Sequence, residues 1–171
     1  VIIAAILLGT GAGTAMGFFF GLFSFLVWTF TPPSPVIAFV FTPFYSFGEM
    51  SGSLWGLFIC FVPRILIGTA AGVLFKLFTK AFSRFDKVKV LTYSLTGFLS
   101  SLVNTLLVLG GIYVIFGQAY AQAVGLSYSL LLGVVGLSVV TSGIPEAVIA
   151  AFLAYAVCYP LHKYLLSKQK I

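Results

Sequence analysis

The most constraining feature of this sequence is how few charged residues it has and how closely they are grouped. The 171 residues include nine Lys or Arg and three Asp or Glu, so 7% are charged, whereas soluble domains carry roughly 25%. Hydrophobic residues make up 61%, and the mean hydropathy is +1.18. Such a chain lacks the polar surface needed to cover a water-soluble fold, so the sequence predicts an integral membrane protein. Disorder, a secreted disulfide scaffold and a nucleic-acid-binding module are excluded by the same composition.

The positions of the charges predict the topology. All but three of them fall in two short windows, residues 76–89 and 163–170. Basic residues beside a membrane span mark the cytosolic side, so we expect the first window and the C-terminus to be cytosolic. The net charge of +6 is therefore explained by topology and requires no acidic partner.

A membrane-spanning helix needs about 20 mostly apolar residues. Four stretches are long enough, at about 12–30, 53–78, 88–116 and 144–166. Residues 126–140 are apolar but too short for a full span, and we expect them to form a re-entrant or interfacial helix. The topology then leaves residues 31–52 and 117–125 outside the cell.

The sequence begins inside an apolar run. We expect residues 1–8 to be the end of a helix whose beginning precedes Val1, followed by a glycine-rich turn at 9–13. With one further helix before it, the chain is expected to have six spans with both ends in the cytosol. The expected fold class is thus all-α, a polytopic membrane helical bundle forming a single domain over residues 1–171.

The external segment 31–52 has an unusual composition for a loop. Four prolines prevent an ordinary helix, and the segment is rich in Phe and Tyr. An apolar, stiff loop has to pack on something, and the mouth of the bundle is nearest. We expect a lid over a cavity; the alternative is an aromatic belt at the membrane interface.

Two stripes of small residues predict close helix contacts. Gly13, Gly17 and Gly21 recur every four residues, and Gly68 and Gly72 repeat the pattern in the next span. Such stripes let helix backbones approach closely in a membrane. They serve either packing within this bundle or docking on another membrane protein.

Arg64 and Glu146 are the charges left within the predicted bundle. Arg64 lies about ten residues into its span, where a charge costs at least ~2.5–3.5 kcal/mol and normally faces a cavity or a partner. Glu146 follows Pro145, which suits the first turn of a helix, where the helix dipole favours a carboxylate. The two residues either form an ion pair or contact a ligand.

Several uncharged residues are further candidates for a binding site. Asn104, the only Asn, lies mid-span and is either a ligand contact or an interhelical hydrogen-bonding group. Tyr113 lies near the external end and is either an interface anchor or a ligand contact. Tyr45 and Trp55 would suit a ligand that contains a flat ring. With one His, two distant Cys and no carboxylate pair, we expect no catalytic residues, no metal site and no cofactor.

Six segments, in order, resemble one family of transport proteins. They are VIIAAILLG (1–9), GFFFGLFSF (17–25), FTPFY (41–45), CFVPRILIG (60–68), LVNTLLVLGGIY (102–113) and GIPEA (143–147). The set is similar to the S-components of energy-coupling factor (ECF) vitamin transporters, most of all to the pantothenate S-component. The resemblance covers nearly the whole chain and is less specific for the vitamin than for the family.

The resemblance implies a function and a set of partners. An S-component lies in the bacterial cell membrane, binds a vitamin near the external face and docks on a transmembrane scaffold, the T-component, which joins it to two cytosolic ATPases. The whole S-component is thought to reorient in the membrane to release the vitamin. A buried Arg64 with Asn104 nearby would suit pantothenate. The alternatives are another vitamin, such as hydroxymethylpyrimidine, riboflavin or pyridoxine, or a self-sufficient secondary transporter or channel.

Overall fold

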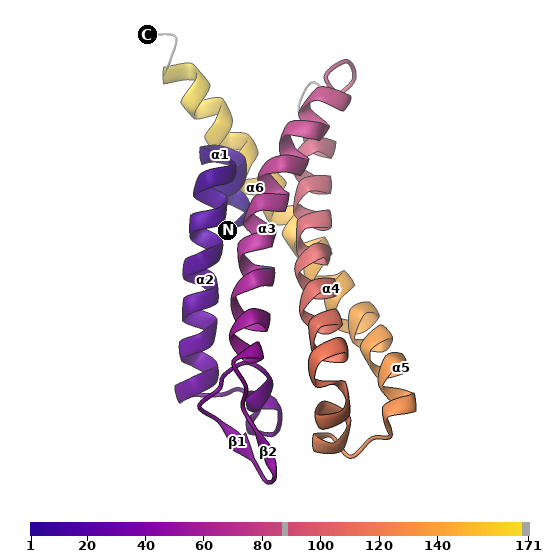
Figure 1. Ribbon diagram of the computed structural model, residues 1–171. Helices are drawn as coiled ribbons and strands as arrows, with labels where there is room; N and C mark the ends of the chain where they lie inside the picture. Colours follow the sequence, from indigo (N-terminus) through magenta and orange to yellow (C-terminus); the bar gives the residue numbers. More distant parts are fainter. Residues whose placement is uncertain (87–88, 169–171) are drawn as a thin grey trace.

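The structure, a computed structural model, is an elongated helical bundle (Figure 1). It describes residues 1–86 and 89–168, with side chains described as far as residue 164. The six α-helices are α1 (Ile2–Leu8), α2 (Thr10–Phe30), α3 (Trp55–Ala81), α4 (Val90–Ala123), α5 (Tyr128–Ser138) and α6 (Ile144–Lys168). The all-α membrane-bundle prediction is confirmed, since four of the described helical segments are long and apolar enough to cross a membrane.

The N-terminal part of the chain departs from the expected glycine-rich turn. Only Gly9, at φ 94°, interrupts the helix, because this left-handed region favours glycine. α2 begins at the next residue and packs along α3 over most of its length, with α1 folded back against both. The predicted turn at 9–13 is therefore a single-residue break.

The C-terminal half corrects two predictions. Residues 117–125 were expected to be an external loop, but α4 continues to Ala123, with Gly117 buried against Tyr128. Residues 126–140 were expected to form a separate short helix. Instead, a π-helical turn at Val139–Gly143 joins α5 to α6, so one 37-residue span runs from Tyr128 to Tyr164.

The proline-rich segment between α2 and α3 folds into the end of the bundle. It forms a short 3₁₀ helix, η1 (Pro35–Val40), and a small hairpin of β1 (Ser46–Phe47) and β2 (Met50–Ser51). Phe39 and Val40 are at most 1% exposed, packed among side chains of α3 and α4. The expectation that this segment folds back onto the mouth of the bundle is confirmed. We call residues 31–54 the plug segment.

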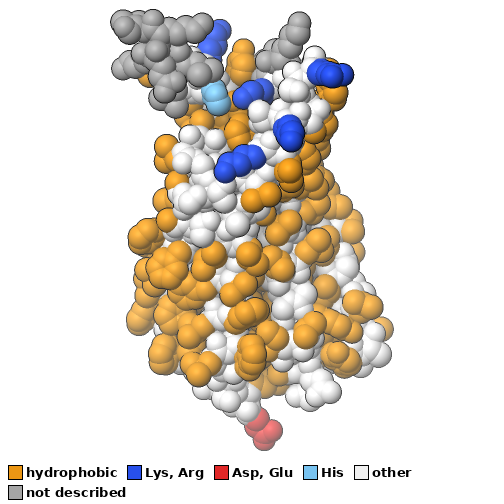
Figure 2. Space-filling model, turned by 45° about the horizontal axis from the view of Figure 1, so that its top comes forward, with side chains coloured by type: hydrophobic (Ala, Val, Ile, Leu, Met, Phe, Trp, Pro, Cys, Tyr) orange, Lys and Arg blue, Asp and Glu red, His pale blue; other side chains and the backbone are white. Residues whose placement is uncertain are grey.

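The charged residues separate toward the two ends of the molecule. Figure 2 shows Lys and Arg side chains gathered at one end and an acidic side chain at the other. The basic end carries the α3–α4 connection and the C-terminal part of α6 (Figure 1). The opposite end carries the plug segment, with Glu49 in the hairpin turn. Between the ends, the visible surface is mostly hydrophobic.

Candidate functional site

Three helices bring Arg64, Asn104 and Glu146 to within about one helical turn of the same depth in the bundle. Helices α3 and α4 are antiparallel, and two contacts show which of their residues lie at the same height along the bundle. Gly111 of α4 faces Ile59 of α3, and Tyr93 of α4 stacks on Phe75 of α3. At 1.5 Å per residue, Asn104 then lies within roughly 2 Å of the level of Arg64 along the helix axis.

The register between α4 and α6 adds the third residue. Gly143 faces Thr105, and Gly97 faces Ala150. Counting from these contacts places Glu146 roughly two residues, or about 3 Å along the axis, from the level of Asn104. We call Arg64, Asn104 and Glu146 the polar layer.

Arg64 is the best-defined member of the polar layer. Its side chain is 9% exposed, and Nη1 donates a hydrogen bond of 2.8 Å to the carbonyl oxygen of Ile59. The guanidinium carbon lies 5.9 Å from the centre of the Phe20 ring, a cation–π arrangement. Its Nε has no hydrogen-bond partner, which is costly for a buried charged group.

The α4 helix presents further unpartnered polar atoms at this depth. Asn104 Oδ1 and Ser100 Oγ are buried without a hydrogen-bond partner, and the two residues lie one turn apart. Buried polar groups in native proteins are nearly always hydrogen-bonded, so these two atoms are candidates for contact with a ligand. An unpaired donor on α3 and an unpaired acceptor on α4 together suit a ligand that carries both kinds of group.

Glu146 lies in the first turn of α6, as predicted. The π turn at Val139–Gly143 joins this turn to α5, so the turn is not a free helix end and the helix dipole contributes less there than the sequence suggests. The wider π turn just before it accommodates Pro145, which cannot donate a hydrogen bond to the preceding turn. Glu146 is exposed and attracts Arg64 electrostatically, but no ion pair joins them among the described residues.

Tyr45 and Trp55 lie at the plug end, away from the polar layer. Tyr45 is partly buried, and its carbonyl oxygen accepts a 2.9 Å hydrogen bond from Gly52 N–H. Trp55 is 58% exposed and meets only Phe58 edge-on among the described rings. The hydrogen bonds and ring contacts of Tyr45 and Trp55 in the described part of the chain do not involve Arg64 or Asn104.

Tyr113 is directed to a different side of α4 from Asn104. Nine residues separate them, which corresponds to half a turn about the helix axis. Tyr113 stacks on Tyr128 of α5, with ring centres 5.7 Å apart. The structure therefore does not bring Tyr113 together with the polar layer.

The glycine stripes lie between α2 and α3. A Cβ at Gly13 would be 2.8 Å from the carbonyl oxygen of Gly68, and one at Gly21 would be 3.2 Å from that of Cys60. Gly17 lies against the backbone of Arg64, and Gly72 lies against Thr10. The closest approach of these glycines is thus within the chain, and it fixes the position of the α3 backbone at Arg64.

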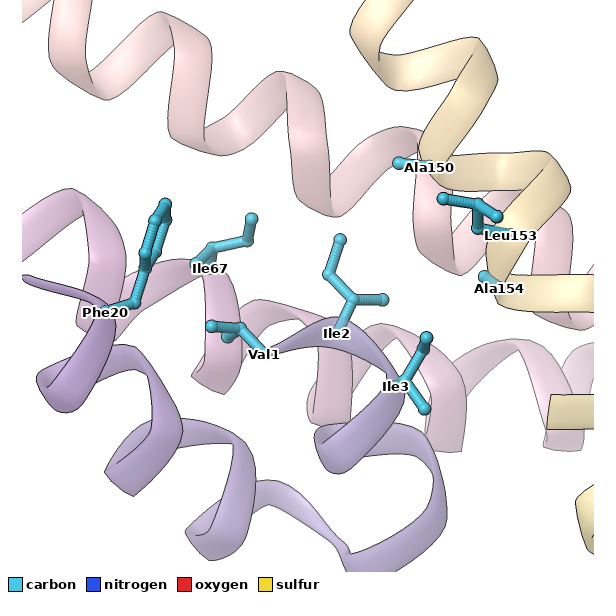
Figure 3. A pocket seen from close by; sticks show the side chains of 8 residues that line it. All are labelled: Val1, Ile2, Ile3, Phe20, Ile67, Ala150, Leu153 and Ala154. Carbon is cyan, nitrogen blue, oxygen red and sulfur yellow. The ribbon is translucent and has the colours of Figure 1, made fainter. Parts of the chain in front are cut away.

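An apolar pocket of about 320 Å³ adjoins the polar layer. Figure 3 shows side chains from α1, α2 and α3 facing those of α6 across it. The lining residues are Val1, Ile2, Ile3, Phe20, Ile67, Ala150, Leu153 and Ala154. A pocket with few polar groups at its edge is the usual form of a small-molecule site.

Two residues near the site were not identified from the sequence. Ser100 has a detectable signal, because it lies four residues before Asn104 and therefore on the same helix face. Phe20 has none, since its position beside Arg64 depends on the α2–α3 register. Over residues 1–86 and 89–168, no group of three or more His, Cys, Asp or Glu is placed to hold a metal ion.

Together, the long apolar helices define a membrane protein, and the polar layer is its candidate site for a small molecule. Residues 1–158 match the family described as the substrate-specific component of ECF transporters. The chain is 36% identical over 166 residues to the pantothenic acid transporter PanT of Lactococcus lactis, covering 95% of this chain and 74% of that protein. The chain therefore belongs to the family of ECF transporter substrate-specific components. No solved structure gave a significant match.

Proposed function

We propose that this protein binds pantothenate within the membrane as the substrate-specific subunit of an ECF importer. The buried guanidinium of Arg64 carries the proposal, because its Nε has no partner and no carboxylate is paired with it in the described part of the chain. Pantothenate ends in a carboxylate that would satisfy this group. The relative named for pantothenic acid transport supports the same vitamin.

The remaining members of the polar layer fit the rest of the molecule. Pantothenate has one amide and two hydroxyl groups, all of which can donate hydrogen bonds. Asn104 Oδ1 is a buried acceptor without a donor among the described residues, and Glu146 offers a carboxylate about 3 Å away along the helix axis. The plug segment would close the site on the external side. Tyr45, Trp55 and Tyr113 have no part in this arrangement.

Binding to the purified protein tests the proposal. Isothermal titration of the protein in nanodiscs should detect one pantothenate per chain. Arg64→Ala should weaken binding tenfold or more, which corresponds to about 1.4 kcal/mol. Arg84→Ala is the matched control, since Arg84 is exposed at the basic end and should leave the affinity unchanged.

The alternatives predict different results in the same assay. Binding of riboflavin, pyridoxine or hydroxymethylpyrimidine in preference to pantothenate would replace the proposed vitamin. Unchanged affinity of Arg64→Ala, with lowered thermal stability, would make Arg64 a packing residue. Pantothenate uptake into sealed vesicles by this protein alone would favour a self-sufficient transporter.

The family membership implies an assembly, whose parts we propose for this chain. They are a transmembrane T-component and two cytosolic ATPase subunits in a bacterial cell membrane. The basic end would face the cytosol, as the positive-inside rule requires. A reporter fused to the C-terminus, active only in the cytosol, should be active in this orientation.

A further inference from the structure

The C-terminal end of α3 carries a row of cations on one side of the helix. Lys76 and Lys80 are one turn apart, and both are exposed. The turn after α3 keeps a helix-like hydrogen bond, since Asp86 N–H donates to the carbonyl oxygen of Phe82 over 2.9 Å. Arg84, which is also exposed, therefore continues the row one turn further. We call Lys76, Lys80 and Arg84 the basic row.

Exposed apolar side chains lie on the same side of α3 as the basic row. Val73 is 45% exposed and Leu77 is 56% exposed. At 3.6 residues per turn, these two residues and the basic row fall within an arc of about 100° around the helix axis. Because α3 is one of the candidate membrane spans, exposed apolar side chains on it suit contact with lipid acyl chains. One side of the helix thus passes from an apolar surface to a cationic one.

The depth of the cations matches the headgroup region of a bilayer. Lys80 and Arg84 lie about 6 Å and 12 Å beyond Lys76 along the helix axis. The headgroup region on each side of the hydrocarbon is roughly 5–8 Å thick. Lys76 lies beside Leu77 at the edge of the apolar surface, where a lysine stem packs on apolar groups and its ammonium extends toward the headgroups. The basic row can therefore place its charges at the level of the lipid phosphates.

The surroundings leave the charge of the basic row largely uncompensated. Of the three acidic residues in the chain, Asp86 is at this end, whereas Glu49 lies in the plug segment and Glu146 in α6. Asp86 Oδ2 accepts hydrogen bonds of 2.7 Å from the N–H and Oγ of Thr92, which directs this carboxylate to the start of α4. The row is therefore suited to an anionic partner outside the bundle.

We propose that the basic row binds the phosphate groups of anionic phospholipids at the membrane surface. Such a lipid carries a phosphate above apolar chains, which matches cations that follow Val73 and Leu77 along one side of a helix. An acidic protein surface would match the cations alone. The row begins roughly 18 Å along the α3 axis from Arg64, so the lipid site is separate from the polar layer and independent of the vitamin bound there.

Titration of the detergent-solubilised protein with fluorescent phosphatidylglycerol, followed by anisotropy, tests the proposal, with fluorescent phosphatidylcholine as the neutral comparison. The unmodified protein should bind the anionic lipid about tenfold more tightly. Lys76→Gln combined with Lys80→Gln should weaken phosphatidylglycerol binding about tenfold or more, because each cation near the lipid charge contributes about fivefold. The same variant should change phosphatidylcholine binding less than twofold. Lys76→Arg combined with Lys80→Arg keeps both charges and should bind like the unmodified protein.

The matched control removes one charge elsewhere at the basic end. Lys163 is exposed near the C-terminal end of α6, which lies apart from the end of α3 (Figure 1). Lys163→Gln should change phosphatidylglycerol affinity less than twofold, whereas Lys80→Gln alone should lower it about fivefold. The substituted side chains are all exposed, so each variant should melt within about 2 °C of the unmodified protein.

Three results would overturn the proposal. Equal losses in Lys163→Gln and Lys80→Gln would show attraction by overall charge without a site. Equal affinity of the unmodified protein for the anionic and the neutral lipid would show that the phosphates are not selected by charge. Soluble glycerol phosphate binding as tightly as phosphatidylglycerol would show a phosphate site that does not use the apolar surface beside the row.

Discussion

A methyl group added at Gly17 should separate α2 from α3. A Cβ at this position would overlap the carbonyl oxygen of Arg64 and lie 2.9 Å from the Cα of Ile65. Both atoms belong to the α3 backbone and cannot rotate away, so the helices must move apart by roughly 1 Å to reach an ordinary contact distance. The displaced backbone is the one that carries Arg64.

The magnitude follows from two opposing terms. Overpacking costs about 1–3 kcal/mol, and a contact between two rigid backbones belongs at the upper end. Replacing Gly by Ala within a helix recovers about 1 kcal/mol. We therefore expect Gly17→Ala to lose about 2 kcal/mol of stability, or roughly 4–8 °C in melting temperature for a chain of this size.

Thermal unfolding in detergent micelles measures this effect, and pantothenate titration measures its consequence at Arg64. Gly11→Ala is the matched control, because nothing lies within 4 Å of a Cβ there. The control should be at least as stable as the unmodified protein. The reasoning is refuted if Gly17→Ala melts at the temperature of Gly11→Ala and binds the vitamin equally well.

Further predictions concern the helix ends, the π turn and the plug end. Asp86 Oδ2 accepts 2.7 Å hydrogen bonds from Thr92 N–H and Oγ. Asp86→Ala should therefore cost about 1–2 kcal/mol in thermal unfolding, and Asp86→Asn less, since its amide oxygen still accepts; equal losses would contradict the assignment. Gly143→Ala should lower the melting temperature, because its Cβ would be 2.8 Å from Thr105 Cγ2. Adding Thr105→Ser removes that methyl group and should restore most of the loss; no recovery would show that the strain lies elsewhere. Trp55→Ala should leave pantothenate affinity within twofold. A larger loss would show that Trp55 belongs to the binding site.

The sequence predicted the features that depend on composition and periodicity. The membrane class, the main spans and the buried plug segment all follow from the distribution of apolar and charged residues. Family membership could also be predicted from the sequence, because six short segments resemble those of the family and occur in the same order. The stripe formed by Gly13, Gly17 and Gly21 was visible as well, although the choice of its partner helix needed the structure.

Features that depend on register could not be predicted. Pro145 predicts the start of α6 correctly, but only the structure shows that a π turn joins α6 to α5 without a loop. The nine-residue spacing of Tyr113 and Asn104 already places them on opposite sides of one helix, but only the structure shows that the Tyr113 side faces α5. The common depth of Arg64 and Asn104 results from interhelical packing, about which a single-helix pattern says nothing.

Because the charges are separated, the two ends of the molecule differ in how much it costs to move them into the lipid when the protein rotates in the membrane. The basic end carries five described cations, Lys76, Lys80, Arg84, Lys89 and Lys163, each costing at least ~2.5–3.5 kcal/mol at the bilayer centre. The plug end carries the single charge of Glu49, and its exposed surface includes Phe44 and Leu54. If the protein tilts as the family resemblance implies, the plug end can be submerged in lipid while the basic end stays in water. The basic end then acts as the pivot of the movement.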